Sequence, residues 1–313
     1  MNPPLQRYPL ALRIIMMLCM FLFNMSIVSF LAIAAVPALF GVENTADVLA
    51  GKLNGAVEMN AFFFIQGIST LGGFALTAMM FAVLEAGEFK HHLRLKIYPS
   101  LKVLLLAVAS IIVSQFFIEF LVEINQKISL PASLQSLYDY QKQAEQVTNA
   151  LMSFTDIGHL ILASVVMALI PAIGEEFFFR GLLLGDLLKG KVHPAIAIPV
   201  TGLIFAISHG QYDNTLAIFA LGSFLGYLYY VSGSLWLPIA AHFVNNFLAV
   251  LLKYLFNIGV ISSDLAEAKT PLYATILSLL IFALFIYLFN KWRNPASFVE
   301  PEEIESSNEI ISE

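Results

Sequence analysis

The sequence predicts an all-α, polytopic membrane protein with about eight transmembrane helices. Apolar residues make up 59% of the chain and charged residues only 12%, against about 25% charged in soluble domains. Apolar runs of about 20 residues, the length that crosses a bilayer, recur along the chain. The single cysteine, Cys19, lies in such a run, which excludes a disulfide framework and a cysteine-based metal site. We therefore expect this protein to lie in a lipid bilayer and to bind no nucleic acid.

The expected spans are residues 14–40, 60–84, 101–118, 157–188, 194–210, 214–231, 235–256 and 271–290. The first span is too long for a removable signal peptide, so we interpret it as a retained helix. The third is short for a span, which indicates that it is tilted or continues through Glu119. The polar, glutamine-rich segment 119–156 is the long outer loop, with some interfacial helix.

The chain divides into four parts: N-terminal transmembrane helices with the outer loop (1–155), a helical core (156–256), a last transmembrane helix (257–293) and an acidic tail (294–313). The tail contains six glutamates after Pro295 and a single aromatic residue, Phe298. Such a composition is typical of a disordered segment.

Lysine and arginine residues are enriched in the cytoplasmic loops of membrane proteins. With the N-terminus placed in the cytoplasm, eleven of them fall inside: Arg7, Arg13, Lys90, Arg94, Lys96, Lys102, Arg180, Lys189, Lys191, Lys291 and Arg293. Five fall outside: Lys52, Lys127, Lys142, Lys253 and Lys269. The distribution predicts that both termini are cytoplasmic. The basic stretch 90–96 fits this topological role.

Two adjacent glutamates, Glu175 and Glu176, interrupt an apolar span. An acidic side chain near the bilayer centre costs about 2.5–3.5 kcal/mol on insertion scales, so such residues usually have a function. Arg180 follows Glu176 by four residues and lies on the same helical face, where it can pair with that carboxylate. Glu175 has no such local cation. We therefore expect Glu176 to be structural and Glu175 to be available for chemistry.

Three further polar residues lie within apolar spans. His209 ends the run 205–208, and His242 and Asn246 are four residues apart on one helix face. Asn245 competes with Asn246 for any role. Polar side chains inside a bilayer must bind one another or line a wet cavity. By contrast, three acidic residues of the first half lie at span ends, where we expect them to reach water: Glu58, Glu85 and Glu119.

Hairpin geometry predicts that Glu175 and His209 meet. The turn between the spans 157–188 and 194–210 centres near Val192, and each residue lies 17 positions from it. In an antiparallel hairpin these positions are level with each other. His242 reaches the same depth if the turn near Val192 projects about 12 Å further than the next turn.

Two kinds of chemistry suit this set of side chains. A glutamate beside a histidine can deprotonate water, and histidine and asparagine can donate hydrogen bonds to an oxyanion. Alternatively, Glu175, His209 and His242 could bind zinc with an open fourth position. The zincin spacing His-Glu-x-x-His is absent, and the residues alone leave both alternatives open.

Residues 175–180 resemble the EExxxR motif of the CPBP intramembrane proteases, the CAAX-protease and bacteriocin-processing family related to Rce1. Residues 205–209 match its FxxxH motif, and residues 242–246 match its HxxxN motif. Each motif alone is weak, but the ordered set is specific. It covers roughly residues 155–255, and the N-terminal half shows only generic spans.

The resemblance implies an intramembrane endopeptidase. Glu175 would activate water with help from His209, and His242 and Asn246 would stabilise the oxyanion. Glu176 and Arg180 would support the helix. The family is described both as metal-dependent and as glutamate-dependent, and we favour the mechanism without metal.

Compact loops and the absence of an organellar leader indicate a bacterial inner membrane. Bacteria generally lack prenylated CAAX proteins, so we expect a membrane-associated peptide or protein as the substrate.

Two other classes of protein remain as alternatives. A proton-coupled transporter would distribute polar residues through both halves and show repeat symmetry, and the sequence shows neither. A non-catalytic scaffold or immunity protein would keep the fold without the catalytic residues, whereas every motif position is intact here.

Overall fold

The computed structural model describes residues 5, 8–53, 55–128, 131, 135–262 and 270–291, and within these residues every regular element is a helix, with no strand. Seven helical segments are long and apolar enough to cross a membrane: Leu10–Phe40, Ala56–Ala86, Leu101–Asn125, Ile157–Lys189, Tyr212–Ser232, Trp236–Asn257 and Leu272–Lys291. This confirms the predicted all-α, polytopic class, and the chain is an integral multi-pass membrane protein. The predicted acidic tail, 294–313, lies outside the described residues.

The fifth predicted span, 194–210, forms a shorter apolar helix, α11 (Pro194–Ser208). Its 15 residues reach about 22 Å, less than the hydrocarbon core of about 30 Å. It begins at a proline, whose fixed φ suits a first helical turn. Just beyond its end, Gly210 has a φ of +61°, a left-handed conformation that glycine adopts without steric cost.

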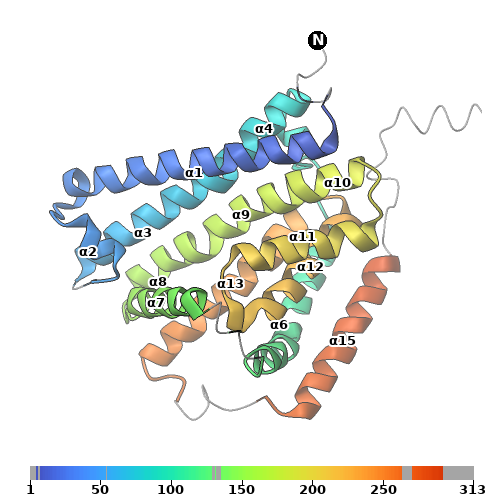
Figure 1. Ribbon diagram of the computed structural model, residues 1–313. Helices are drawn as coiled ribbons and strands as arrows, with labels where there is room; N and C mark the ends of the chain where they lie inside the picture. Colours follow the sequence, from blue (N-terminus) through green and yellow to red (C-terminus); the bar gives the residue numbers. More distant parts are fainter. Residues whose placement is uncertain are drawn as a thin grey trace, which may run out of the picture.

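The N-terminal half contains α1 (Leu10–Phe40), α2 (Thr45–Leu49), α3 (Ala56–Thr70), the π-helical η2 (Leu71–Leu76), α4 (Thr77–Ala86), α5 (Phe89–His92), α6 (Leu101–Asn125) and α7 (Gln135–Leu151). Figure 1 shows α1 running beside α3 and α4. Helix α6 continues past Glu119, one of the two outcomes expected for the third span. Helix α7 is the helix expected within the outer segment 119–156.

The second half begins with one continuous helix of 33 residues. It comprises α8 (Ile157–Ala163), η4 (Ser164–Leu169), α9 (Ile170–Glu176), η5 (Phe177–Leu184) and α10 (Gly185–Lys189), of which η4 and η5 are π-helical. After α11 come the short 3₁₀ turn η6 (Tyr212–Asn214), α12 (Thr215–Ser232), α13 (Trp236–Asn257) and α15 (Leu272–Lys291). Helix α13 packs against η4, α9 and α6, and thus joins the two halves.

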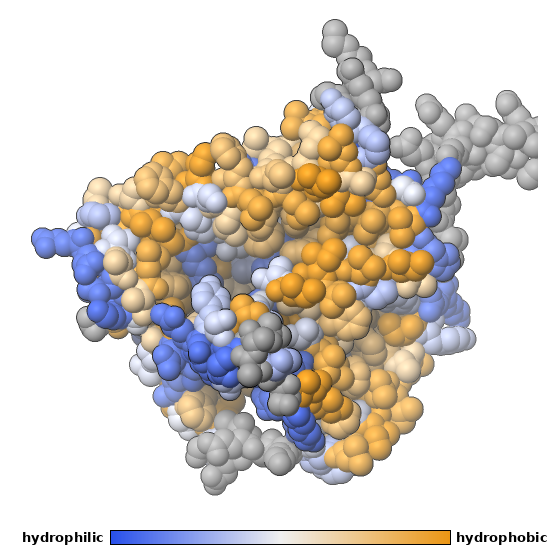
Figure 2. Space-filling view, viewed as in Figure 1, coloured by the Kyte–Doolittle hydropathy of each residue, from blue (hydrophilic) through white to orange (hydrophobic). Residues whose placement is uncertain are grey.

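The surface is that of a membrane protein. In Figure 2 apolar side chains cover much of the visible face, and hydrophilic residues gather at its left and right edges and in a patch across its lower middle. Large apolar side chains of α1 are exposed, among them Phe23 at 64% and Phe30 at 70%. Contiguous apolar surface of this extent is rare on soluble monomers, and lipid tails would cover it here.

Helices α11 and α12 approach closely at two glycines. A Cβ atom placed on Gly222 would lie 2.9 Å from the Phe205 ring and 3.3 Å from the backbone of Gly202. Small residues allow such close packing between membrane helices. The approach brings the Gly222 carbonyl towards the interior of the bundle, where it takes part in the site described below.

The structure contradicts the expectation that Glu85, at the end of a span, reaches water. Glu85 is only 2% exposed and forms an ion pair with Arg13 of α1, Nη1 to Oε1, at 2.7 Å. Its partners come from elements distant in sequence, so the position at a span end was a poor guide to exposure. Glu58 remains partly exposed and Glu119 also keeps some contact with solvent.

Candidate active site

The two glutamates end α9, directly before the π-helical η5. A π-helical segment widens the helix locally, and such segments occur often at functional sites. Arg180 lies within η5, four residues after Glu176. The helix therefore presents the two carboxylates differently: the Glu176 side chain is 0% exposed and the Glu175 side chain is 14% exposed.

Glu176 belongs to a buried, hydrogen-bonded ion pair. Arg180 Nη1 donates to Glu176 Oε1 at 2.6 Å, and its Nη2 donates to the Gly222 carbonyl at 2.7 Å. The guanidinium also lies over the Phe205 ring, 4.6 Å from its centroid. Arg180 thus ties η5 to α11 and α12 as well as to Glu176. The predicted pairing of Glu176 with Arg180 is present.

Glu175 faces two histidines from other helices. Its Oε2 lies 3.9 Å from Nε2 of His209, which follows α11, and 3.9 Å from Nε2 of His242 on α13. This Oε2 is buried and has no hydrogen-bond partner among the described residues. The hairpin geometry correctly placed Glu175 and His209 at one depth, and His242 reaches the same point. The three groups converge on a shared space.

Hydrogen bonds on the far side of each ring fix its orientation. His242 Nδ1 lies 2.8 Å from Glu176 Oε1, and His209 Nδ1 lies 2.7 Å from the Phe205 carbonyl. Because a carboxylate and a carbonyl only accept hydrogen bonds, each Nδ1 carries a proton. In a neutral ring Nε2 then has a free lone pair, and both lone pairs are directed toward Glu175.

Asn246 lies one helical turn beyond His242 on α13, as the sequence spacing predicted. Its Oδ1 accepts a hydrogen bond from Asn245 Nδ2 at 3.2 Å, which leaves its own amide group as a donor. Asn245 Oδ1 in turn accepts from Gln115 Nε2 of α6 at 3.3 Å. Asn245 therefore bridges to α6. No hydrogen bond joins Asn246 to Glu175 in the described part of the chain.

Two residues that hold the loop after His209 were not predicted from the sequence. Asn125, at the end of α6, donates to the Tyr212 carbonyl at 2.6 Å and accepts from the Leu216 amide at 2.7 Å. Gln141 of α7 accepts from the Tyr212 amide at 2.8 Å. Both side chains belong to the N-terminal half. No local motif marks them, because each contact joins positions more than 70 residues apart.

The donor set resembles a zinc shell in chemistry but is wider in geometry. Histidine ligands of zinc usually donate their second N–H to a carboxylate or carbonyl, as His209 and His242 do here. Zinc ligands at about 2.0–2.1 Å in a tetrahedron lie about 3.4 Å apart, whereas the separations from Glu175 are 3.9 Å. Zinc would thus require these side chains to move inward.

The part of the chain that contains the three ordered motifs is similar to known proteins. Residues 157–248 match the family described as type II CAAX prenyl endopeptidase Rce1-like. The same stretch contains every residue of the candidate site, and the resemblance inferred from the motifs is confirmed over it.

The chain is also similar to the Bacillus subtilis protein named "Putative membrane peptidase YdiL", with 29% identity over 92 residues. That alignment covers 29% of this chain and 37% of the relative, so it spans little more than a third of the relative's length. No solved structure matches.

Proposed function

We propose that this protein is an intramembrane endopeptidase that hydrolyses membrane-associated peptides or proteins with water activated by Glu175. The observation that carries the proposal is the buried, unpartnered Glu175 Oε2, which faces Nε2 of both His209 and His242. The family match over the same residues supports the peptidase class. We propose a broad class of substrates, since the alignment with the putative membrane peptidase covers 29% of this chain.

In the proposed reaction a water molecule binds between Glu175 and His209. Glu175 accepts one proton from the water as its oxygen attacks the carbonyl carbon of the scissile bond. His209, held by the Phe205 carbonyl, accepts the other hydrogen as a hydrogen bond and orients the water. Collapse of the tetrahedral intermediate breaks the C–N bond, and the proton on Glu175 passes to the leaving nitrogen.

His242 and Asn246 are the proposed donors to the oxyanion. Asn246 has an amide donor available. His242 can donate from Nε2 only as an imidazolium, since its Nδ1 proton already binds Glu176. A carboxylate hydrogen-bonded to Nδ1 stabilises that charged form, as in other histidine–carboxylate pairs. Glu176 would thus support catalysis through His242 as well as holding Arg180.

A zinc-dependent variant of this function is the second candidate, favoured by the two Nε2 lone pairs. Glu175, His209 and His242 would hold the ion, which would lower the pKa of its bound water to about 7. The two versions differ in one measurable way, because chelation would abolish activity only if zinc is required.

Purified protein in liposomes, incubated with membrane-inserted model peptides, tests the function. Cleavage products identified by mass spectrometry are expected, and they should persist after treatment with EDTA. Loss of cleavage on chelation, restored by Zn²⁺, would instead support the zinc-dependent variant. No cleavage of any peptide in a broad membrane-peptide library would favour the non-catalytic scaffold.

Asn246→Ala is expected to lower kcat about 100-fold, the effect typical of removing one oxyanion donor, with little change in KM. The matched control is Asn245→Ala, because the neighbouring amide bonds Gln115 of α6. That variant should keep most of its turnover and lose some thermal stability. The reverse result would assign the oxyanion role to Asn245.

We also propose that the protein lies in the bacterial inner membrane with both termini in the cytoplasm. Eleven basic residues fall on that side and five on the other. Single cysteines introduced at Lys96 and at Lys52, in a Cys19→Ser background, test this orientation. A membrane-impermeant thiol reagent applied to intact cells should label position 52 and spare position 96. Labelling of position 96 alone would reverse the topology.

A further inference from the structure

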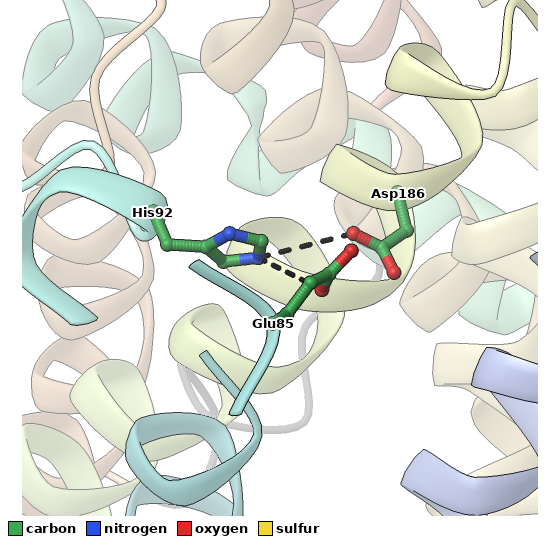
Figure 3. Close-up of side chains that lie close together, drawn as sticks. All are labelled: Glu85, His92 and Asp186. Atoms are coloured by element: carbon green, nitrogen blue, oxygen red, sulfur yellow. Dashed lines mark ion pairs between the residues drawn. The ribbon is translucent and has the colours of Figure 1, made fainter. Parts of the chain in front are cut away.

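A second polar cluster lies where α4, α5 and α10 meet, away from the glutamates of α9. Glu85, His92 and Asp186 face one another there, as Figure 3 shows. Their side chains are 3%, 3% and 2% exposed. His92 Nε2 lies 3.3 Å from Glu85 Oε2 and 3.8 Å from Asp186 Oδ1. The cluster is buried almost completely, although each residue has a polar side chain.

Each carboxylate uses one oxygen and leaves the other without a donor. Arg13 of α1 holds the outer pair of oxygens, Glu85 Oε1 at 2.7 Å and Asp186 Oδ2 at 3.4 Å. The inner oxygens, Glu85 Oε2 and Asp186 Oδ1, are buried without a hydrogen-bond partner among the described residues. Two buried acceptors directed at one space are costly unless a shared proton or a cation lies between them.

We propose that Glu85, His92 and Asp186 form a binding site for a divalent transition-metal ion such as Zn²⁺ or Mn²⁺. The three ligand atoms all lie within 4.8 Å of one another. Among the described residues, no other group of three or more histidine, cysteine, aspartate or glutamate side chains lies this close together. One imidazole nitrogen and two carboxylate oxygens suit this class of ion. Nε2 of His92 lies 3.3 Å from the Glu85 oxygen, close to the distance of about 3.4 Å between tetrahedral ligands, and 3.8 Å from the Asp186 oxygen, so Asp186 would move slightly inward on binding.

The existing contacts agree with this role. Arg13 on the outer oxygens orients the carboxylates, as the surroundings of metal sites commonly do. The neutral imidazole is the form of histidine that binds metals. The helices α4, α5 and α10 supply one ligand each, so an ion would link three separate segments.

The positively charged ammonium group of Lys189 would repel a metal ion bound beside His92. Its Nζ lies 3.2 Å from His92 Nδ1 and 3.5 Å from Nε2, the proposed ligand atom, so the ammonium group has to move away before an ion binds. Lys189 is an exposed residue at the end of α10, so its side chain can swing into solvent when an ion binds. Removal of this lysine should then strengthen binding.

The proposed ion would restrain the helix that carries Glu175. Asp186 follows Glu175 by 11 residues on the same continuous helix, about 16 Å along its axis. The ion would not touch the candidate active site. It would fix the end of that helix to α4 and α5 of the N-terminal half, and this inference stands whether or not the protein is a peptidase.

Metal titration of the detergent-purified protein, prepared without a polyhistidine tag and stripped with EDTA, tests the proposal. Zn²⁺ and Mn²⁺ are the probes, measured by calorimetry and by thermal unfolding. One ion per chain is expected at this site, with a higher melting temperature on binding. Glu85→Gln and Asp186→Asn should each weaken affinity at least about tenfold, and Lys189→Gln should strengthen it.

Two controls separate this site from others. Glu88→Gln removes an exposed carboxylate three residues from Glu85, paired only with Lys96 among the described residues, and should leave affinity unchanged. Glu175→Gln tests for binding at the candidate active site. Melting of each variant without metal shows whether it is folded. The proposal would be overturned if the wild-type protein showed no saturable metal binding. It would also be overturned if folded Glu85→Gln and Asp186→Asn bound the metal as tightly as the wild type.

Discussion

Glu175→Gln is expected to lower the rate of peptide hydrolysis by about 100- to 10,000-fold, the usual contribution of a general base. Glutamine has nearly the same shape and can occupy the same space between the two histidines, but its amide cannot accept a proton from water. Substrate affinity should change little, because Glu175 is proposed to act on water. The measurement is single-turnover cleavage of a peptide in liposomes by wild-type and variant protein.

The matched control for this experiment is Glu58→Gln. Glu58 is a partly exposed carboxylate of α3, outside the residues that match the peptidase family. The Glu58→Gln variant should cleave the peptide at the wild-type rate. Equal rates for Glu175→Gln and wild type would remove Glu175 from the mechanism. If Glu176→Gln were inactive and Glu175→Gln were active, Glu176 would be the general base and Glu175 the structural residue.

His209 provides an independent check of the same mechanism. His209→Ala removes the group proposed to orient the water but leaves the carboxylate in place, so its rate should fall less than that of Glu175→Gln. A double variant should be no slower than Glu175→Gln alone, because residues that act as one unit are not additive. Additive losses would mean that the two side chains act in separate steps.

The contacts of Glu175 and Glu176 could be predicted from the sequence because they follow from local rules. Arg180 is four residues from Glu176, a spacing that any helix brings together. Glu175 and His209 are equidistant from a hairpin turn, and antiparallel packing makes them level. Each relation depends only on helix geometry. The positions of the seven long helices likewise followed from runs of apolar residues.

The second polar cluster could not be predicted in this way. Glu85 and Asp186 are separated by 101 residues, and neither α4 nor α10 contains a sequence pattern that predicts contact between them. His92 lies in a basic stretch that fitted a topological role. Its burial depends on how α1, α4 and α10 pack, a property of the tertiary structure.

Arg180→Met is expected to destabilise the protein by about 3–5 kcal/mol, because it leaves the Glu176 carboxylate buried without its cation. The side chains of the pair are 1% and 0% exposed, so water cannot replace the lost partner. The Gly222 carbonyl would lose its donor as well. The free energy of unfolding, measured by SDS titration in mixed micelles, reports the change.

A double variant separates charge from packing. In Glu176→Gln/Arg180→Met the buried charge is gone, and the new glutamine can still accept a hydrogen bond from His242. This variant should therefore be more stable than Arg180→Met alone. The exposed pair of Lys96 and Glu88 is the control, and Lys96→Met should cause no measurable loss, as is usual for surface ion pairs. Equal destabilisation by the single and double variants would show that Arg180 stabilises the fold through its contacts with Phe205 and Gly222, with its charge contributing little.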